Sequence, residues 1–286
     1  MNAPGSTFGP PSTDLEATRV TVGEIELNVI DHGEGDAVLL LHGFPDSAQL
    51  WRRQIPALRD AGFRVIAPDL RGFGQSDAPE GAESYGLAAV VGDVVALLDA
   101  GGVERAHVVG HDWGAAAAWG LGALLPDRVE RLVALSVGHP ATFLGTMDQR
   151  ALSWYMLLFA RPEAEDILSR EDWRLFREWV GAAKDVERYV ADLSRPGRLT
   201  AGLNWYRANV SAESFAGGSA SGLPPVECPT MGVWSTEDFA LGERQMTDSA
   251  SSVNGPWRYE RIEGAGHWMA LDAPDRLNEL LLDFLG

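Results

Sequence analysis

The sequence predicts an α/β fold, with a mostly parallel central sheet flanked by helices and an inserted helical cap. Short apolar runs that end in polar or glycine-containing turns recur along the first half of the chain, as buried parallel strands do. Helical patterns separate these runs, and such alternation is typical of βαβ units. The alternation stops near residue 139 and resumes near residue 224. We therefore expect one core interrupted by an insertion.

The first half of the chain contains the clearest elements of the predicted core. We expect strands at the apolar runs Val38–Leu41, Arg64–Ala67, His107–Gly110 and Arg131–Val137. Apolar residues cover one helical face of Tyr85–Leu98, and the alanine-rich segment Ala115–Leu125 precedes Pro126, which ends a helix. Both segments are predicted to be helices that connect neighbouring strands.

The second half of the chain contains the predicted cap and the return to the core. Helical segments rich in tryptophan and charge run from Met147 to Arg207 without a strand pattern between them, and the small-residue stretch Ala216–Gly222 leads back to the core. Strands and helices then alternate again over Thr230–Trp234, Glu243–Ser251, Arg258–Ile262 and Pro274–Phe284. We predict a core over 15–138 and 224–286, a helical cap over 139–223, and a loose leader over 1–14.

Composition excludes several classes of function. A net charge of −18 argues against nucleic acid as a partner, because phosphate binding needs clustered basic residues. No apolar run reaches the roughly 18 residues of a membrane span, and the first residues do not resemble a secretory signal. The single cysteine, Cys228, fits a reducing cytoplasm. We expect no cofactor and no metal, because metal-ligand clusters and phosphate-cradling glycine loops are not recognisable; the oligomeric state stays open, with a homodimer among the alternatives.

The segment Gly110-His111-Asp112-Trp113-Gly114 lies between a predicted strand and a predicted helix. Glycines on both flanks of a central residue are what a sharp turn needs to present one side chain above the sheet. That side chain is the carboxylate of Asp112, at a helix N-terminus whose dipole favours the ionised form. We predict that Asp112 is a nucleophile.

A carboxylate that attacks carbon forms an ester with the enzyme, so turnover needs a base that activates water. His267, in a glycine-rich loop after a predicted strand, is the candidate base. Asp238 follows another predicted strand and is expected to orient the imidazole, with the neighbouring Glu237 as the alternative. For the oxyanion of the second step, the pattern predicts two backbone N–H donors, from Trp113 and Phe44.

At this point the sequence resembles the α/β-hydrolase superfamily from about Val20 to Gly286, and within it the epoxide hydrolases with an aspartate nucleophile. The resemblance rests on GHDWG around Asp112, HGFP around Phe44, DLRGFGQS at residues 69–76 and GHWMALDAP from residue 266. It implies two cap tyrosines above the nucleophile, which match Tyr155 in WYMLLF and Tyr206 in NWYR. Phenols can hydrogen-bond and protonate the alkoxide that ring opening produces.

The function that this resemblance implies is the opening of an epoxide to a vicinal diol through an ester on Asp112. The cap and pocket hold many aromatic residues, which suggests an apolar or aromatic small-molecule epoxide. The candidate substrate-binding tryptophans are Trp113, Trp154, Trp205 and Trp268, with packing in the core as the equal alternative for each. Family members often carry an Asn-x-Pro-Phe-like sequence before the cap, where this chain has VGHP at residues 137–140.

Two other functions remain as alternatives. Haloalkane dehalogenases share the turn and its tryptophan, but they resemble one another in having an asparagine where this chain has Phe44, which offers no side-chain donor to a halide. Fluoroacetate-type dehalogenases place an arginine where this chain has Trp113. A non-catalytic ligand-binding protein on the same scaffold is the third hypothesis. Such a protein would bind a ligand without releasing diol or halide.

Overall fold

The computed structural model of the chain describes residues 16–217 and 222–286, so the leader predicted over 1–14 lies outside the described residues. Within them, eight strands form one sheet in the order β1-β2-β4-β3-β5-β6-β7-β8. The strands β3 to β8 are parallel to one another, whereas β2 pairs with β1 and with β4 in antiparallel fashion. The predicted fold class is confirmed.

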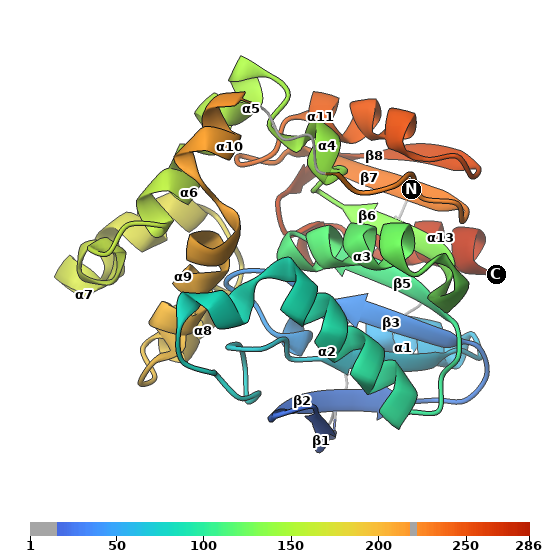
Figure 1. Cartoon of the computed structure of the whole chain (residues 1–286). Helices are drawn as coiled ribbons and strands as arrows, with labels where there is room; N and C mark the ends of the chain where they lie inside the picture. The colour runs from blue at the N-terminus through green and yellow to red at the C-terminus, as the bar shows by residue number, and fades with distance from the viewer. Residues whose placement is uncertain (1–15, 218–221) are drawn as a thin grey trace, which may run out of the picture.

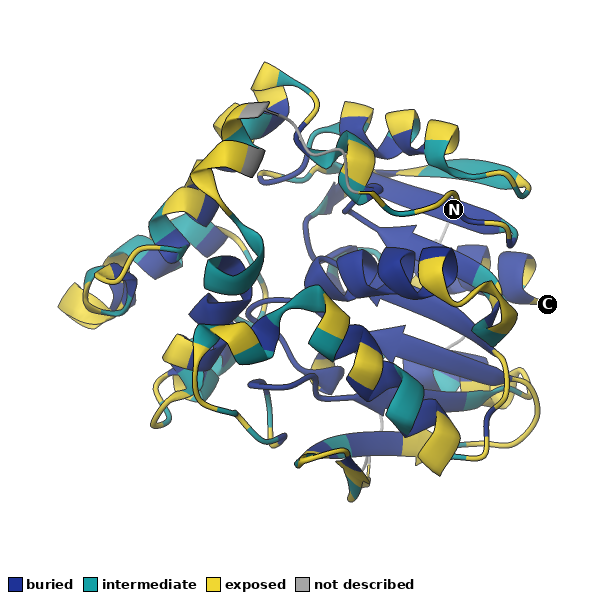
Figure 2. Cartoon of the chain, viewed as in Figure 1, coloured by how far each residue is buried: buried dark blue, intermediate teal, exposed yellow. Residues whose placement is uncertain are grey.

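The parallel strands coincide with the apolar runs of the sequence. Their bounds are β3 Ala37–Leu41, β4 Arg64–Pro68, β5 Ala106–His111, β6 Val129–Leu135, β7 Thr230–Glu237 and β8 Trp257–Gly266. Every residue of β3 and β5 is buried, because helices cover both faces of the sheet. Figure 2 shows the buried central strands and the exposed outer faces of the helices.

Helices lie on both faces of the sheet, as Figure 1 shows, with α2 and α3 in front and α1 and α13 behind. The core helices are α1 Gln54–Asp60, α2 Leu87–Ala100, α3 Trp113–Leu124, α11 Glu243–Thr247, α12 Met269–Asp272 and α13 Pro274–Leu285. Short 3-10 turns span Ala48–Trp51, Ala82–Tyr85, Pro126–Arg128 and Asp248–Ser252. The predicted helix over Glu243–Ser251 is therefore a short α-helix followed by one of these turns. No helix in the described part of the chain has the length and apolar character of a membrane span.

One pair of strands was not predicted. Strands β1, Ala17–Val22, and β2, Ile25–His32, form an antiparallel hairpin at the edge of the sheet. Val22 pairs with Ile25, so only two residues connect the strands, and the first of them, Gly23, has φ of 62°. Hairpin turns of two residues need such positive φ values, which glycine adopts without strain.

The cap consists of the helices between β6 and β7, which we call the cap helices. They are α4 Pro140–Phe143, α5 Met147–Leu152, α6 Trp154–Phe159, α7 Ala164–Val180, α8 Val186–Leu193, α9 Arg198–Asn209 and α10 Ala212–Gly217. Figure 1 shows α6, α7 and α9 standing beside the core on the left of the view. The loops that follow the parallel strands lie on the side of the sheet edge that faces these helices.

Buried polar contacts hold the cap helices against the core. The carboxylate of Asp46, in the loop after β3, accepts hydrogen bonds from Arg188 at 2.6 Å and from the Tyr189 hydroxyl at 2.8 Å, both on α8. On α9, the indole of Trp205 donates to the backbone carbonyl of Arg71 at 3.2 Å. Removing one partner of a buried ion pair is costly, because the other charge stays unpaired. These contacts fix α8 and α9 relative to the sheet.

Candidate active site

The side chain of Asp112 projects from the turn between β5 and α3. Asp112 has φ of 54° and ψ of −121°, a backbone conformation that non-glycine residues rarely adopt. A Cβ atom at Gly114 would collide with the carbonyl of Leu41, and one at Gly43 would collide with the Asp112 carboxylate. The glycines of GHDWG and HGFP are therefore required by the close approach of β3, the loop after it and the turn.

The Asp112 carboxylate faces backbone donors on one side and open space on the other. The N–H of Phe44 donates to its Oδ1 at 2.8 Å. Burial raises the pKa of Asp112 above its usual value, while the His267 charge and the N–H groups of Trp113 and Phe44 act in the opposite direction. The helix N-terminus, from which the sequence predicts an ionised carboxylate, favours the charged form, but in the folded chain burial has the larger effect on the pKa of Asp112.

His267 and Asp238 form a hydrogen-bonded pair beside Asp112. His267 Nδ1 lies 2.9 Å from Asp238 Oδ2, and because a carboxylate only accepts, Nδ1 carries the proton. The other ring nitrogen, Nε2, lies 3.9 Å from Asp112 Oδ2. Burial lowers the pKa of His267, but the charge and hydrogen bond of Asp238 and the charge of Asp112 outweigh it, so the pKa is raised.

Asp238, and not its neighbour Glu237, faces the imidazole. The Asp238 side chain is fully buried, and its second oxygen accepts hydrogen bonds from the N–H groups of Ala240 and Leu241 at 2.9 and 3.0 Å. Glu237 is exposed. Three donors therefore hold the Asp238 carboxylate in one orientation.

Two residues that the sequence argument did not assign hold the His267 loop in place. His111 Nε2 lies 2.9 Å from the backbone carbonyl of His267 and donates to it, and Ser136 Oγ donates to the same oxygen at 3.3 Å. Burial lowers the pKa of His111 well below its usual value, so this ring stays neutral. The sequence feature that could have indicated this role for His111 is its position in the turn motif, directly before Asp112.

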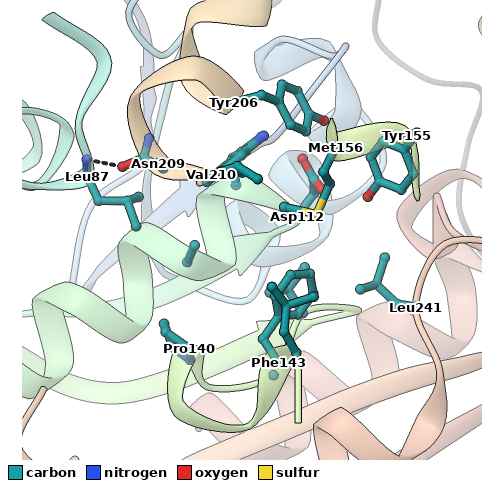
Figure 3. Close-up of a pocket in the computed structure, with 15 residues that line it drawn as sticks. Leu87, Asp112, Pro140, Phe143, Tyr155, Met156, Tyr206, Asn209, Val210 and Leu241 are labelled. Atoms are coloured by element: carbon teal, nitrogen blue, oxygen red, sulfur yellow. Dashed lines mark hydrogen bonds between the residues drawn. The ribbon is translucent and has the colours of Figure 1, made fainter. Parts of the chain in front are cut away.

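Tyr155 on α6 and Tyr206 on α9 extend from the cap toward Asp112. Both are buried, their ring centroids are 6.2 Å apart, and both line the same cavity as Asp112. Figure 3 shows both hydroxyl oxygens on the side that faces the carboxylate. Burial, together with the nearby charge of Asp112, raises the pKa of each phenol well above its usual value. Both phenols therefore remain protonated donors at neutral pH.

The cavity above Asp112 contains about 810 Å³ of space that protein atoms do not fill, including its mouth, and we call it the front cavity. Its polar lining residues are Asp112, the two tyrosines and Asn209. The amide of Asn209 is already bonded to the backbone of Tyr85, Leu87 and Trp205, and Figure 3 shows the bond to Leu87. Apolar side chains and backbone form the remaining wall, so the front cavity suits an apolar ligand.

The comparison with family models identifies the fold. The model of the alpha/beta hydrolase fold matches residues 36–274, which is most of the chain. The chain belongs to the α/β-hydrolase superfamily. This α/β-hydrolase is 34% identical to the AB hydrolase superfamily protein YfhM of Bacillus subtilis, over 93% of this chain and 96% of that protein. It is 33% identical to Epoxide hydrolase A of Mycobacterium tuberculosis, over 97% of this chain and 98% of that protein.

Solved structures place this α/β-hydrolase in the same group. A structure described as one of the novel epoxide hydrolases from metagenomes of hot environments superposes with a TM-score of 0.85 at 32% identity, covering 96% of this chain and 99% of that chain. The Bacillus megaterium epoxide hydrolase in complex with an inhibitor gives a TM-score of 0.84 at 27% identity, covering 94% and 99%. The predicted membership of the epoxide hydrolase family is confirmed.

The tryptophans of this α/β-hydrolase require a correction. Of the four that were predicted to bind substrate, only Trp113 lines the front cavity. Trp154 is 49% exposed on the outer side of α6, and Trp205 is fully buried, with its indole bonded to the backbone of the core. Trp268 packs against His267 with ring centroids 5.0 Å apart and lines a different cavity. For Trp154 the reason is helical phase, because α6 turns Trp154 outward and its neighbour Tyr155 inward.

The apolar wall of the front cavity was not predicted in detail. Its side chains come from the start of the cap, from α6, from the end of α9 and from the loop after Asp238; the lining includes Pro140, Phe143, Leu144, Met156, Val210 and Leu241. The residues of VGHP line the cavity except His139, whose Nδ1 accepts from the N–H of Ala141 and caps α4. The departure from the family pattern thus lies in the cavity wall of this α/β-hydrolase.

Proposed function

We propose that this hydrolase opens an epoxide to a vicinal diol through a covalent ester on Asp112. The observation that carries the proposal is the placement of one carboxylate and two protonated phenols on the same apolar cavity, with His267 beside the carboxylate. Asp112 Oδ2 attacks a ring carbon, the carbon–oxygen bond of the ring breaks, and the released oxygen takes a proton from Tyr155 or Tyr206.

In the second step His267 removes a proton from water as the water oxygen attacks the ester carbonyl carbon. The resulting oxyanion at Oδ1 is stabilised by the N–H groups of Phe44 and Trp113, each worth about 2.7 to 4 kcal/mol in comparable sites. Collapse of the intermediate releases the diol oxygen, which takes the proton from His267. The proton left over from water restores the phenol, so one epoxide and one water yield one diol.

The surroundings of Phe44 support an epoxide over a haloalkane as substrate. Its backbone N–H is engaged with Asp112, and its ring packs among aromatic rings, with centroid distances of 5.5 Å to Tyr206 and 5.6 Å to Phe159. A phenyl ring offers no hydrogen-bond donor to a leaving halide. The two phenols above Asp112, in contrast, suit an oxygen leaving group that needs a proton.

Oxygen labelling tests the covalent mechanism directly. With enzyme in excess over styrene oxide in heavy-oxygen water, the diol of the first turnover is expected to carry no label, because its new oxygen comes from Asp112. Label is expected to enter the diol in later turnovers, after water has exchanged into the carboxylate. Label in the first-turnover diol would overturn the proposal, and so would halide release from haloalkanes in a parallel assay without any conversion of epoxides.

Replacing both Tyr155 and Tyr206 with phenylalanine is expected to slow ester formation strongly. Acid assistance of this kind is typically worth about a hundredfold to ten-thousandfold, so the double variant should lose about that factor and each single variant less. Rapid-quench measurement of the first turnover checks this result. Tyr259→Phe, which removes a hydroxyl bonded to Glu243 outside the cavity, is the matched control and should leave the rate unchanged. A double variant with the wild-type rate of ester formation would exclude the phenols as acids.

A further inference from the structure

A second cavity lies beside His267, and we call it the rear cavity. It is formed by residues 178–184 at the end of α7 and beyond, by the loop after β7 and by residues 264–272, and it contains about 1080 Å³ of unfilled space, including its mouth. His267 lines the rear cavity and Asp112 does not, whereas Asp112 lines the front cavity and His267 does not. The two members of the Asp112 and His267 pair therefore border different cavities.

The two cavities differ in chemistry. Among the described residues, the ionisable ones that line the front cavity are Asp112 and the two tyrosines. The rear cavity carries the charged side chains of Glu178, Lys184, Glu237 and Asp272. Three of these, Glu178, Lys184 and Glu237, are exposed, so they surround its opening to solvent. Ionised groups retain water, while an apolar cavity filled by an alkyl group excludes it.

Once the ester has formed, water needs a way to Asp112 other than the front cavity. After ester formation the alkyl group occupies the front cavity and covers the approach to Asp112 from that side. His267 Nε2 lies only 3.9 Å from Asp112 Oδ2, so the water that it activates must reach this gap. We infer that the rear cavity supplies the hydrolytic water to His267, while the epoxide enters through the front cavity. This inference rests on the covalent mechanism proposed above.

Aromatic residues that line the rear cavity pack against His267 and Tyr155. The Phe239 ring lies 6.0 Å from the His267 ring and 5.6 Å from the Trp179 ring, and Trp179 in turn lies 4.9 Å from Tyr155. The indole N–H groups of Trp179 and Trp268 are buried without an acceptor among the described residues, and both tryptophans line this cavity. Buried donors without partners are costly, and water is an acceptor small enough to satisfy them as it passes.

The test is to fill the rear cavity without touching a reacting group. Ala183 is partly buried against the core and lines the cavity, so Ala183→Trp adds a ring there. With styrene oxide as the probe, we expect the rate of ester formation to stay within about twofold and the rate of ester hydrolysis to fall by roughly tenfold. In the steady state kcat and KM should then fall together, leaving kcat/KM unchanged. Rapid-quench mass spectrometry of the Asp112 peptide measures both steps separately.

Three further variants make the outcome decisive. Ala182→Trp, at an exposed position of the same cavity, should give the same result and replaces Ala183→Trp if that variant does not fold. Val210→Trp narrows the front cavity and should slow ester formation instead. Ala250→Trp, an exposed position outside both cavities, should change neither step. Unchanged ester hydrolysis in folded Ala182→Trp or Ala183→Trp would overturn the rear route and leave the covalent mechanism standing; no ester in the wild type would overturn the mechanism itself.

Discussion

An Asp112→Asn variant is expected to fold normally and to lose diol formation by a factor on the order of 10⁴ or more. An amide oxygen is a much weaker nucleophile than a carboxylate, so the first bond to carbon does not form. Asparagine tolerates the φ of 54° at this position better than most residues, and its side-chain oxygen can still accept the Phe44 N–H. The loss therefore reflects chemistry and not a distorted turn.

Steady-state assays with styrene oxide measure this loss, and mass spectrometry of the purified variant verifies that the amide is intact. Thermal unfolding should give a melting temperature close to that of the wild type or above it, because burial of the Asp112 carboxylate opposes its charge. Asp127→Asn, which changes an exposed carboxylate in the turn after α3, serves as the control with full activity. Diol formation at the wild-type rate by the verified Asp112→Asn protein would rule out Asp112 as nucleophile.

A His267→Gln variant is expected to form the ester and then stop. The first step needs Asp112 and the phenols, whereas the second needs a base, whose loss typically costs about a hundredfold to ten-thousandfold. The alkyl-enzyme should accumulate to one equivalent and appear as an increase in the mass of the Asp112 peptide equal to the mass of the epoxide. Asp238→Asn should show a weaker form of the same behaviour, because it removes the charge that holds and supports the imidazole.

Two further variants test whether the trapped ester lies on Asp112 and whether its accumulation is specific to the loss of His267. The double variant Asp112→Asn and His267→Gln should show no adduct, which locates the ester on Asp112. His32→Gln, at a ring that is hydrogen-bonded to the backbone carbonyl of Glu16, should behave as the wild type. If His267→Gln hydrolyses the ester as fast as the wild type, the base of the second step is another group.

The parallel strands β3 to β7 were predictable because most of their residues are buried and they appear as apolar runs. Strand β5, for example, is buried along its whole length, and its apolar residues end at the turn that carries Asp112. The edge hairpin of β1 and β2 has a different pattern of burial, since only Leu27, Val29 and Ile30 of β2 are buried. So few buried positions on either side of Gly23 give neither an apolar run nor a clear alternation, so the sequence did not predict these two strands.

The reacting groups were predictable because a chain-order rule and backbone geometry determine them together. Asp112, Asp238 and His267 each follow a strand, so their loops meet at one edge of the sheet. In the cap, no comparable rule predicts which side chains face the front cavity. Neighbours such as Trp154 and Tyr155 differ by about 100° around a helix, and the sequence of a six-residue helix does not define which of them faces inward. The lining of the front cavity therefore needed the structure.

The position of Phe44 has a consequence for how new specificities can arise. One residue provides both a donor to Asp112, through its N–H, and a central ring in the packing between cap and core, with cap neighbours Phe159, Phe176, Trp179 and Tyr206. Movement of the cap away from the core would break the ring contacts of Phe44 and would also displace its N–H from Asp112. We therefore expect the cap to stay in place during turnover, so that substitutions at the entrance of the front cavity alter selectivity without disturbing Asp112.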